Sequence, residues 1–370
     1  MERDIEDGGR EGLKIFNAKD AKILKRFSPS LTRTRASNIG TDLITPTVPN
    51  QHCHLKNLCV LCVKSINLIS TTTATERQTL PKIAILIPAE DYEEDWSVLE
   101  ADYRRLFGDS VTFRRWTEPG DLSGFDLVSP LIAWGYHRDL PRWLVLLDWI
   151  EAEGIKTSNP VGVLRWNSDK NYLFELADQD VPIVPTRSTY ELGYDDLVFI
   201  RECCSCDELV IKPPVSGGAD GTYLLNLVDP IPANSLGKPM LVQPYFPTIA
   251  TEGEYSLFYF GGEFSHSIIK RPAPGDFRVQ DQFGGYEEAV DAPQAATVLA
   301  QSALAATAEI TGTGVLAYAR VDMLRDDAGA FRLMELELIE PSLFLQFAAD
   351  KGEAFAKTIC CQNLANDALL

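Results

Sequence analysis

Three acidic side chains near the end of the chain, Asp322, Glu335 and Glu337, have the spacing of a cation site. Residues 319–324 and 331–338 each alternate polar and apolar residues, which is the period of a β-strand with one buried face. The turn-prone segment between them predicts a hairpin that brings the acids together. Clustered carboxylates repel one another, and Mg²⁺ held by carboxylates and substrate phosphates is a common way to neutralise them. The hairpin therefore predicts a metal site with a phosphate partner.

A plainer interpretation of the same hairpin stays open. Acidic residues also face solvent on edge strands, where their charge discourages aggregation. Glu340 adds another acid close by, so the sequence leaves open which of Glu335, Glu337 and Glu340 would contact a metal.

A lysine followed by a glycine-rich loop supplies the complementary charge. Lys212 ends an apolar strand expected over residues 208–212, and Gly217, Gly218 and Gly221 follow it. Glycines let backbone N–H groups approach phosphate oxygens, and a lysine adds a point charge. This is not a P-loop, because GxxxxGK[ST] is absent. The alternative is a plain hairpin loop.

Lys170 is a second candidate phosphate ligand. We expect a helix to begin at residues 167–171 and to end near residue 178, with Lys170 in its first turn. The helix macrodipole prefers anions there, and an anionic ligand beside the lysine would remove the conflict. An exposed lysine of trivial cost is the alternative.

Two further segments could complete a nucleotide site. A strand expected over residues 239–246 ends at Gln243 and Tyr245, where the backbone could pair with a base edge. The polar, glycine-bearing loop of residues 275–285 carries Arg278 and suits closure over phosphates or substrate.

The elements that must position these residues alternate between strand and helix in the first half, which indicates an open α/β sheet. No GxGxxG follows the first strand, which argues against the usual dinucleotide fold. The expected strands cover residues 82–88, 110–116, 125–130 and 181–186, a hairpin joins 253–260 to 263–271, and helices cover 96–107, 140–151, 293–310 and 342–364, the last capped by Ser342.

Composition limits the function classes. The chain has 370 residues, 45% of them hydrophobic and 24% charged, as in a globular protein. A net charge of −19 argues against a nucleic-acid surface, and the absence of a long apolar run argues against a membrane span. The partner expected is a small molecule.

Residues 1–80 read as a separate leader without sustained periodicity, expected to be largely disordered. A zinc half-site is the alternative for its cluster of His52, Cys53, His54, Cys59 and Cys62, whose spacing fits no complete finger pattern. The spacing of the other cysteines does not indicate a secreted disulfide scaffold, so we expect a reducing, cytoplasmic setting.

In the order of these motifs, residues 82–365 resemble the ATP-grasp superfamily of carboxylate-amine ligases. The resemblance implies an ATP-grasp fold, α/β with α+β nucleotide-binding parts. Its expected domains are an N-terminal open parallel-sheet domain (81–185), a small lobe (186–250) and a C-terminal lobe (251–370), the two lobes clamping ATP. It implies the following site residues: Lys170, Lys212, Gly217, Gly218, Gly221, Gln243, Tyr245 and Glu254 around ATP, Asp322, Glu335 and Glu337 on Mg²⁺ or Mn²⁺, and Arg278 with Lys212 in catalysis.

One departure from the family pattern is that Glu337 stands where an asparagine is common. Residues 253–257, 275–280 and 335–343 resemble the branch that contains the cyclo-ligase of D-cycloserine biosynthesis. The activity implied is ATP-dependent activation of a small carboxylate, such as that of O-ureidoserine, followed by C–N bond formation within one molecule. An intermolecular amino-acid or peptide ligase, a nucleotide-binding module without turnover, and a homo-oligomeric assembly also remain open.

Overall fold

The computed structural model describes residues 81–367, with side chains described to residue 361. These residues belong to one compact unit, Leu80–Leu370. The expectations for the leader, including the His52 to Cys62 cluster, lie outside the described residues.

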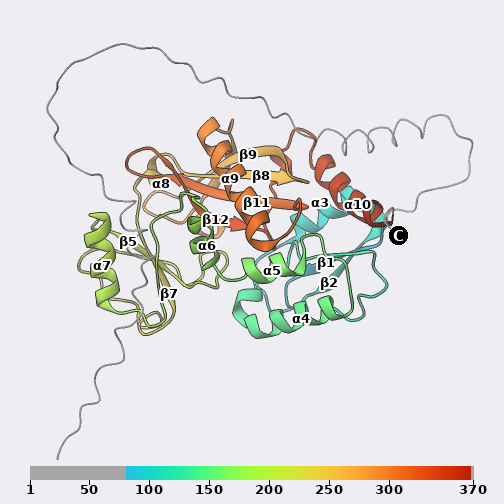
Figure 1. Ribbon diagram of the computed structural model, residues 1–370, viewed down its shortest axis with the longest axis horizontal. Coiled ribbons are helices and arrows are strands. Elements are labelled where there is room, and N and C mark those ends of the chain that lie inside the picture. Colours follow the sequence, from blue (N-terminus) through green and yellow to red (C-terminus); the bar gives the residue numbers. More distant parts are fainter. Residues whose placement is uncertain (1–80, 368–370) are drawn as a thin grey trace, which may run out of the picture. The chain divides into compact units, whose positions relative to one another are not determined.

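A parallel sheet in the order β2-β1-β3 opens the described part of the chain. Its strands are β1 (Ile83–Ile87), β2 (Val111–Arg115) and β3 (Leu127–Ser129). Ile83 and Ile85 pack toward α3 (Ser97–Phe107) and α10 (Glu353–Asp367), whereas Ala84 and Leu86 pack toward α4 (Leu140–Ala152). Because both faces of β1 are covered, its sequence is continuously apolar. Figure 1 shows the helices on the two sides.

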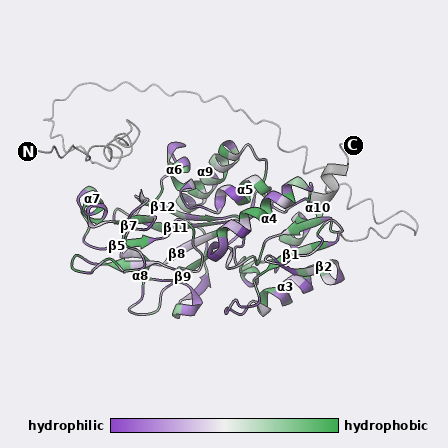
Figure 2. Cartoon of the chain, turned by 90° about the horizontal axis from the view of Figure 1, so that it is seen from below, coloured by the Kyte–Doolittle hydropathy of each residue, from purple (hydrophilic) through white to green (hydrophobic). Residues whose placement is uncertain are grey.

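A second, antiparallel sheet has the order β4-β7-β5-β6. It consists of β4 (Arg187–Thr189), β5 (Leu209–Lys212), β6 (Tyr223–Leu225) and β7 (Met240–Pro244), and α7 (Tyr194–Cys204) packs against it. Figure 2 shows the hydrophobic character of β5. Lys212 is the last residue of β5; it is buried and precedes the glycine-rich loop.

A third sheet has the order β10-β9-β8-β11-β12. It carries the acids singled out from the sequence: Glu254, Asp322, Glu335 and Glu337. Its strands are β8 (Glu254–Phe260), β9 (Glu263–Arg271), β10 (Tyr286–Ala289), β11 (Tyr318–Arg325) and β12 (Phe331–Glu337), with α8 (Thr248–Thr251) before β8. The alanine-rich α9 (Gln294–Thr311) and α6 (Tyr172–Asp178) contribute residues to the core on one face. Both expected hairpins are present, because β8 pairs with β9 and β11 pairs with β12 in antiparallel register.

Two expectations about the segments near residues 170 and 186 were wrong. Lys170 is not in a helix: α5 (Val161–Asn167) ends before it and α6 begins at Tyr172, so it lies in the short connection. Residues 181–186 are extended with one isolated bridge, Ile183 to Leu333, and the strand begins only at Arg187.

The closing helix also begins later than expected. Ser342 does not cap it, because Phe344 adopts a left-handed conformation (φ 47°) that interrupts any helix there. The carboxylate of Asp350 instead accepts hydrogen bonds from the backbone N–H groups of Gly352 and Ala354 at 3.0 and 2.7 Å, at the start of α10. No helix among residues 81–367 is long and apolar enough to cross a membrane.

Candidate active site

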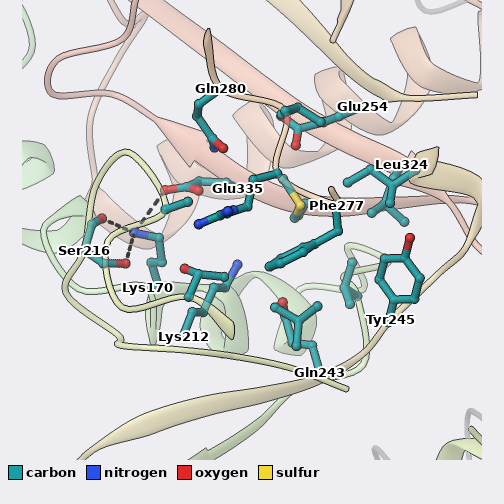
Figure 3. A pocket seen from close by; sticks show the side chains of 18 of the residues that line it. Lys170, Lys212, Ser216, Gln243, Tyr245, Glu254, Phe277, Gln280, Leu324 and Glu335 are labelled. Carbon is teal, nitrogen blue, oxygen red and sulfur yellow. Dashed lines mark hydrogen bonds and ion pairs between the residues drawn. The ribbon is translucent and has the colours of Figure 1, made fainter. Parts of the chain in front are cut away.

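A pocket between the second and third sheets gathers most of the residues singled out from the sequence. Figure 3 shows Lys170, Lys212, Gln243, Tyr245, Glu254 and Glu335 around it. Gly217, Gly218, Arg278 and Glu337 also line this first cavity, whereas Gly221 and Asp322 lie outside its lining. The residues come from separate strands and loops, so folding alone brings them together.

The Lys212 side chain is a buried cation without a partner. Only 7% of the residue is exposed, and its ammonium makes no hydrogen bond or ion pair with the side chains and backbone described in residues 81–361. Burial lowers the pKa of Lys212, although the acids around it oppose this effect. A buried charge is costly unless it is paired, so this position favours an anionic ligand.

The ammonium of Lys170, in contrast, already has partners within the protein. Its ammonium donates to the carbonyl oxygen of Ser216, lies 3.3 Å from the Ser216 hydroxyl, and forms an ion pair of 3.1 Å with Glu335. The dashed lines in Figure 3 mark these contacts. Lys170 therefore ties the glycine-rich loop to the acidic hairpin.

The glycine-rich loop needs its glycines at two positions. Gly218 and Gly221 have φ angles of 57° and 69°, a region that disfavours residues with a Cβ atom. A Cβ at Gly221 would also lie 2.8 Å from the Pro213 ring. The loop is connected to the segment of residues 275–285 by a hydrogen bond of 3.0 Å from the Gln282 amide to the Gly218 carbonyl. The two loops thus meet at the cavity.

The opposite end of the cavity is apolar. Val184, Ile249 and Leu324 form a small buried cluster, with Phe246 and Met334 packed against it. These side chains suit a flat, apolar ring such as a nucleobase. Gln243 is buried beside them and donates a hydrogen bond of 2.8 Å to the hydroxyl of Thr186, and the Tyr245 ring meets Phe277 edge to face at 6.5 Å.

The predicted acidic hairpin is present and brings the acids together, since Asp322 lies opposite Glu335 and Arg320 lies opposite Glu337. Asp322, however, is already paired with cations of the protein. It is 1% exposed, and Arg320 donates to it at 2.9 Å, Lys270 at 3.3 Å and the Ser256 hydroxyl at 2.6 Å. Burial alone would raise the pKa of Asp322, but Arg320 and Lys270 outweigh this effect and hold it at about 2.

Glu337 and Glu254 share the same two cations. Glu337 forms an ion pair with Arg320, and Glu254 forms one with Lys270. Burial is the main cause that raises the pKa of both carboxyls, that of Glu337 to about 7. Two cations are therefore too few to keep all these acids ionised, and the site has room for further positive charge. Within residues 81–361, no three His, Cys, Asp or Glu side chains form a complete metal cage.

Arg278 reaches the cavity from the loop of residues 275–285, but Asp276 holds its guanidinium. Two hydrogen bonds of 3.0 and 2.8 Å join the two side chains, and the guanidinium also stacks on Phe283 at 3.6 Å. A role for Arg278 on a phosphate requires exchange of this carboxylate for the ligand.

A second cavity of about 460 Å³ adjoins the first. Eight residues line both cavities: Lys170, Ser216, Gly217, Gly218, Val279, Gln280, Glu335 and Glu337. The remaining wall includes residues after β3, among them Tyr136 and His137, together with Tyr92, Gln282 and Glu340. A molecule in the second cavity would therefore lie next to the lysine and acids of the first.

Sequence reasoning missed several of these residues. Lys270 and Arg320 are the cations that neutralise the acids, and both belong to strands whose alternation placed them on the acidic face. Alternation could have found them. His137 carries no such local signal, because it reaches the site only through the packing of a turn beyond β3.

The comparisons with known proteins agree with one family. No family model matches the chain. The cycloserine biosynthesis protein DcsG of Streptomyces lavendulae is 31% identical over 257 residues, which cover 65% of this chain and 84% of that protein. The crystal structure of D-cycloserine synthetase DcsG matches with a TM-score of 0.63 and 25% identity, covering 76% of this chain and 99% of that chain.

More distant structures share the fold. The D-alanine–D-alanine ligase of Bacillus anthracis matches with a TM-score of 0.55 and 18% identity, covering 78% of this chain and 99% of that one. A structure of that ligase complexed with ATP matches equally well, with a TM-score of 0.55. The chain belongs to the ATP-grasp family of ligases, in the branch of the cycloserine biosynthesis protein DcsG, and is an ATP-dependent ligase that forms C–N bonds.

Proposed function

We propose that this ligase activates the carboxylate of a small amino-acid derivative and closes that molecule on itself. The observation that carries the proposal is the pairing of a buried, unpartnered Lys212 with an adjoining second cavity. The first cavity offers an anion site beside an apolar base pocket, and the second has the volume of a small metabolite. Similarity to a cycloserine biosynthesis protein supports a cyclic product and O-ureidoserine as the first substrate to test.

The nucleotide would lie with its base against Leu324 and Met334 and its phosphates toward Lys212. Gln243 and Tyr245 would border the adenine, and backbone N–H groups of the loop around Gly217, Gly218 and Gly221 would face the phosphates. Glu254 borders the same cavity. Lys170 already touches this loop through Ser216, so it is placed to follow the phosphates as the loop closes.

The acids fit Mg²⁺, with Mn²⁺ as a substitute. Mg²⁺ in phosphate sites takes only one or two carboxylates, and the phosphates complete its shell. Glu335 and Glu337 line both cavities, and burial raises the pKa of Glu337 to about 7 despite its ion pair with Arg320, so a further cation would favour its ionised form. We propose these two as ligands together with Asp322, which would exchange contacts with Arg320 or Lys270. The ion would neutralise charge on the transferred phosphoryl group.

In the reaction, the substrate carboxylate attacks the terminal phosphorus of ATP, giving ADP and an acyl phosphate. An N–H nitrogen of the same substrate then forms the C–N bond, the C–O bond to phosphate breaks, and phosphate leaves with the proton that the nitrogen loses. The protein contributes position and charge rather than a nucleophile. Lys212 stabilises the transferred phosphoryl group, and Arg278 does so once it is released from Asp276.

The test is ADP release with Mg²⁺ and a panel of amino acids, dipeptides and O-ureidoserine. We expect one compound alone to stimulate release, and the Lys212→Ala variant to remove it, whereas Lys238→Ala at an exposed position leaves it intact. Removal of Mg²⁺ with a chelator should stop release, and Mg²⁺ or Mn²⁺ should restore it. Release that requires two different compounds would instead favour an intermolecular ligase. Nucleotide binding without ADP release for any compound would contradict the proposal.

We also propose the division into an N-terminal domain (81–185), a small lobe (186–250) and a C-terminal lobe (251–370). Support comes from the three sheets, each of which draws all its strands from one of these segments. A cytoplasmic location is part of the proposal, supported by the free thiols of Cys203, Cys204, Cys206 and Cys360. Size-exclusion chromatography with light scattering would show whether the chain is a homo-oligomer.

A further inference from the structure

Buried polar atoms without partners concentrate in the second cavity. Among the described side chains, five buried N or O atoms make no hydrogen bond, and they belong to Tyr103, His137, Tyr259 and Gln280. Three of the five atoms are Nδ1 and Nε2 of His137 and Oε1 of Gln280. His137 lines the second cavity and Gln280 lines both cavities. Native proteins satisfy nearly all buried polar atoms with protein groups, ordered water or a ligand, so these atoms are available to a bound molecule.

His137 is held in place by packing and not by hydrogen bonds. Its side chain is 7% exposed, and a Cβ on Gly217 would lie 3.1 Å from Nδ1, so the ring rests against the glycine-rich loop. Nε2 lies 3.5 Å from a carboxylate oxygen of Asp220, which is longer than a normal hydrogen bond. Burial lowers the pKa of His137, which leaves the ring neutral and one nitrogen able to accept.

A buried acid accompanies these acceptors. Burial raises the pKa of Glu340 well above its usual range and Glu337 adds to this effect, so a cation beside Glu340 would favour its ionised form. Glu340 lines the second cavity but not the first, unlike Glu335 and Glu337, which line both. Its carboxylate makes no ion pair with any cation in residues 81–361. Glu94 and Glu287 are further acids in the same wall. Lys270 and Arg320 also line this cavity, but they are paired with Glu254, Asp322 and Glu337. Among the described residues of this lining, the buried polar atoms left without a partner belong to His137 and Gln280.

From this arrangement we propose that the second cavity binds the protonated amino group of the substrate, with His137, Gln280 and Glu340 as its recognition residues. An ammonium carries three N–H donors and no acceptor, which complements two neutral acceptors and one carboxylate. The carboxylate of the same molecule points toward Lys170 and the shared wall, where it meets the nucleotide. The inference rests on the proposed function and deepens it, because it assigns the residues that select amino acids over plain carboxylic acids.

The test compares matched ligands that differ only in the amino group. The first pair is O-ureidoserine and 3-(ureidooxy)propanoate, and the second pair is serine and 3-hydroxypropanoate. Calorimetric titration of the full chain saturated with ADP and Mg²⁺ gives the affinity for each probe. We expect the wild type to prefer the amino form of at least one pair by about tenfold or more, the scale of one charge-assisted hydrogen bond.

The variants then separate recognition from packing. His137→Phe keeps a planar ring without nitrogens, Glu340→Gln removes the charge, and Gln280→Leu removes the acceptor that Gln280→Glu retains. The first three should reduce the preference for the amino form to less than about threefold, without weakening the deamino probes, and Gln280→Glu should keep it. Tyr103→Phe and Tyr259→Phe remove unpartnered buried hydroxyls outside both cavities and should leave the preference unchanged.

The inference is overturned if the wild type shows no preference in either pair, or if the preference survives in His137→Phe, Gln280→Leu and Glu340→Gln. It is equally overturned if the variants weaken both members of a pair alike, since that result indicates a packing role. These outcomes do not depend on turnover. Failure of the proposed function appears separately, as absence of ADP release with the same compounds.

Discussion

At the scale of single residues, Lys212 shows how the site keeps charge for a ligand at the expense of stability. A buried ammonium without a partner costs free energy in the unliganded protein, and an anion restores it. Lys170 shows the complementary case, because Ser216 and Glu335 already satisfy its ammonium. Lys170 thus connects two segments of the protein, whereas the charge of Lys212 remains available to a ligand. Sequence patterns alone could not distinguish the two lysines.

Replacement of Lys212 by methionine should therefore separate activity from stability. We expect Lys212→Met to lower ADP release about 100-fold or more, because an electrostatic contact to the transferred phosphoryl group is lost. The same variant should raise the free energy of unfolding of the ligand-free protein by about 1–3 kcal/mol, because a desolvated charge is removed. Steady-state ADP release and urea unfolding measure the two effects. A variant that is both active and less stable would show that Lys212 has a structural role.

At the scale of elements, alternation and glycine placement predicted much of the site. The β11–β12 hairpin, β5 ending in Lys212 and the β8–β9 hairpin were all predicted, because a period of two residues and turn-forming residues act locally. The ion pairs that hold Asp322 were not predicted. Alternation puts Arg320 on the same face of β11 as Asp322, but the contact of Asp322 with Lys270 depends on the pairing of β8 with both β9 and β11. α7 was missed although its signal was present: the Asp196 carboxylate accepts from the Gly193 N–H at 2.9 Å, which begins the helix.

The loop of residues 275–285 depends on Gly285. A Cβ there would lie 2.2 Å from the carbonyl oxygen of Val279, so the loop would have to move. We expect Gly285→Ala to lower kcat/KM for ADP release about tenfold or more, because displaced Phe277 and Gln280 no longer shape the cavities. Gly162→Ala is the matched control, since a Cβ meets nothing within 4 Å there. Equal kinetics in the two variants would argue against a role for the loop.

Strand β9 carries a pH-sensitive residue that lies outside both cavities. His266 stacks on Phe258 with ring centroids 4.2 Å apart, and burial lowers its pKa from 6.5 to about 4. The unfolded chain therefore binds a proton that the folded protein does not, so stability is present above pH 6.5 and is lost as the pH falls toward 4. Between pH 7 and pH 5 this single group should remove about 2 kcal/mol from the free energy of unfolding.

Urea unfolding of the wild type and of His266→Phe at the two pH values isolates this contribution. The variant keeps the stacked ring but has no group to protonate. Between pH 7 and pH 5 its free energy of unfolding should therefore fall by about 2 kcal/mol less than that of the wild type. Parallel changes in the two proteins would show that other groups cause the acid sensitivity.

At the scale of the whole molecule, the described sheets and cavities all come from residues 81–361. The unit Leu80–Leu370 is compact by itself, and the similarity to DcsG covers 65% of the chain. We therefore expect deletion of residues 1–79 to leave the melting temperature within about 2 °C and ADP release within about twofold of the full chain. Loss of folding or of activity would instead assign the N-terminal segment a role, for example through its cysteines and histidines.

The central claim is that ATP activates the substrate carboxylate, and transfer of an oxygen isotope tests it most directly. The substrate found by ADP release is prepared with ¹⁸O in its carboxylate, and the released phosphate is analysed by mass spectrometry. An acyl phosphate carries one carboxylate oxygen to phosphorus, so the account predicts one ¹⁸O atom in each phosphate released. Phosphate without ¹⁸O would contradict it, because ATP would then be cleaved without activating the carboxylate.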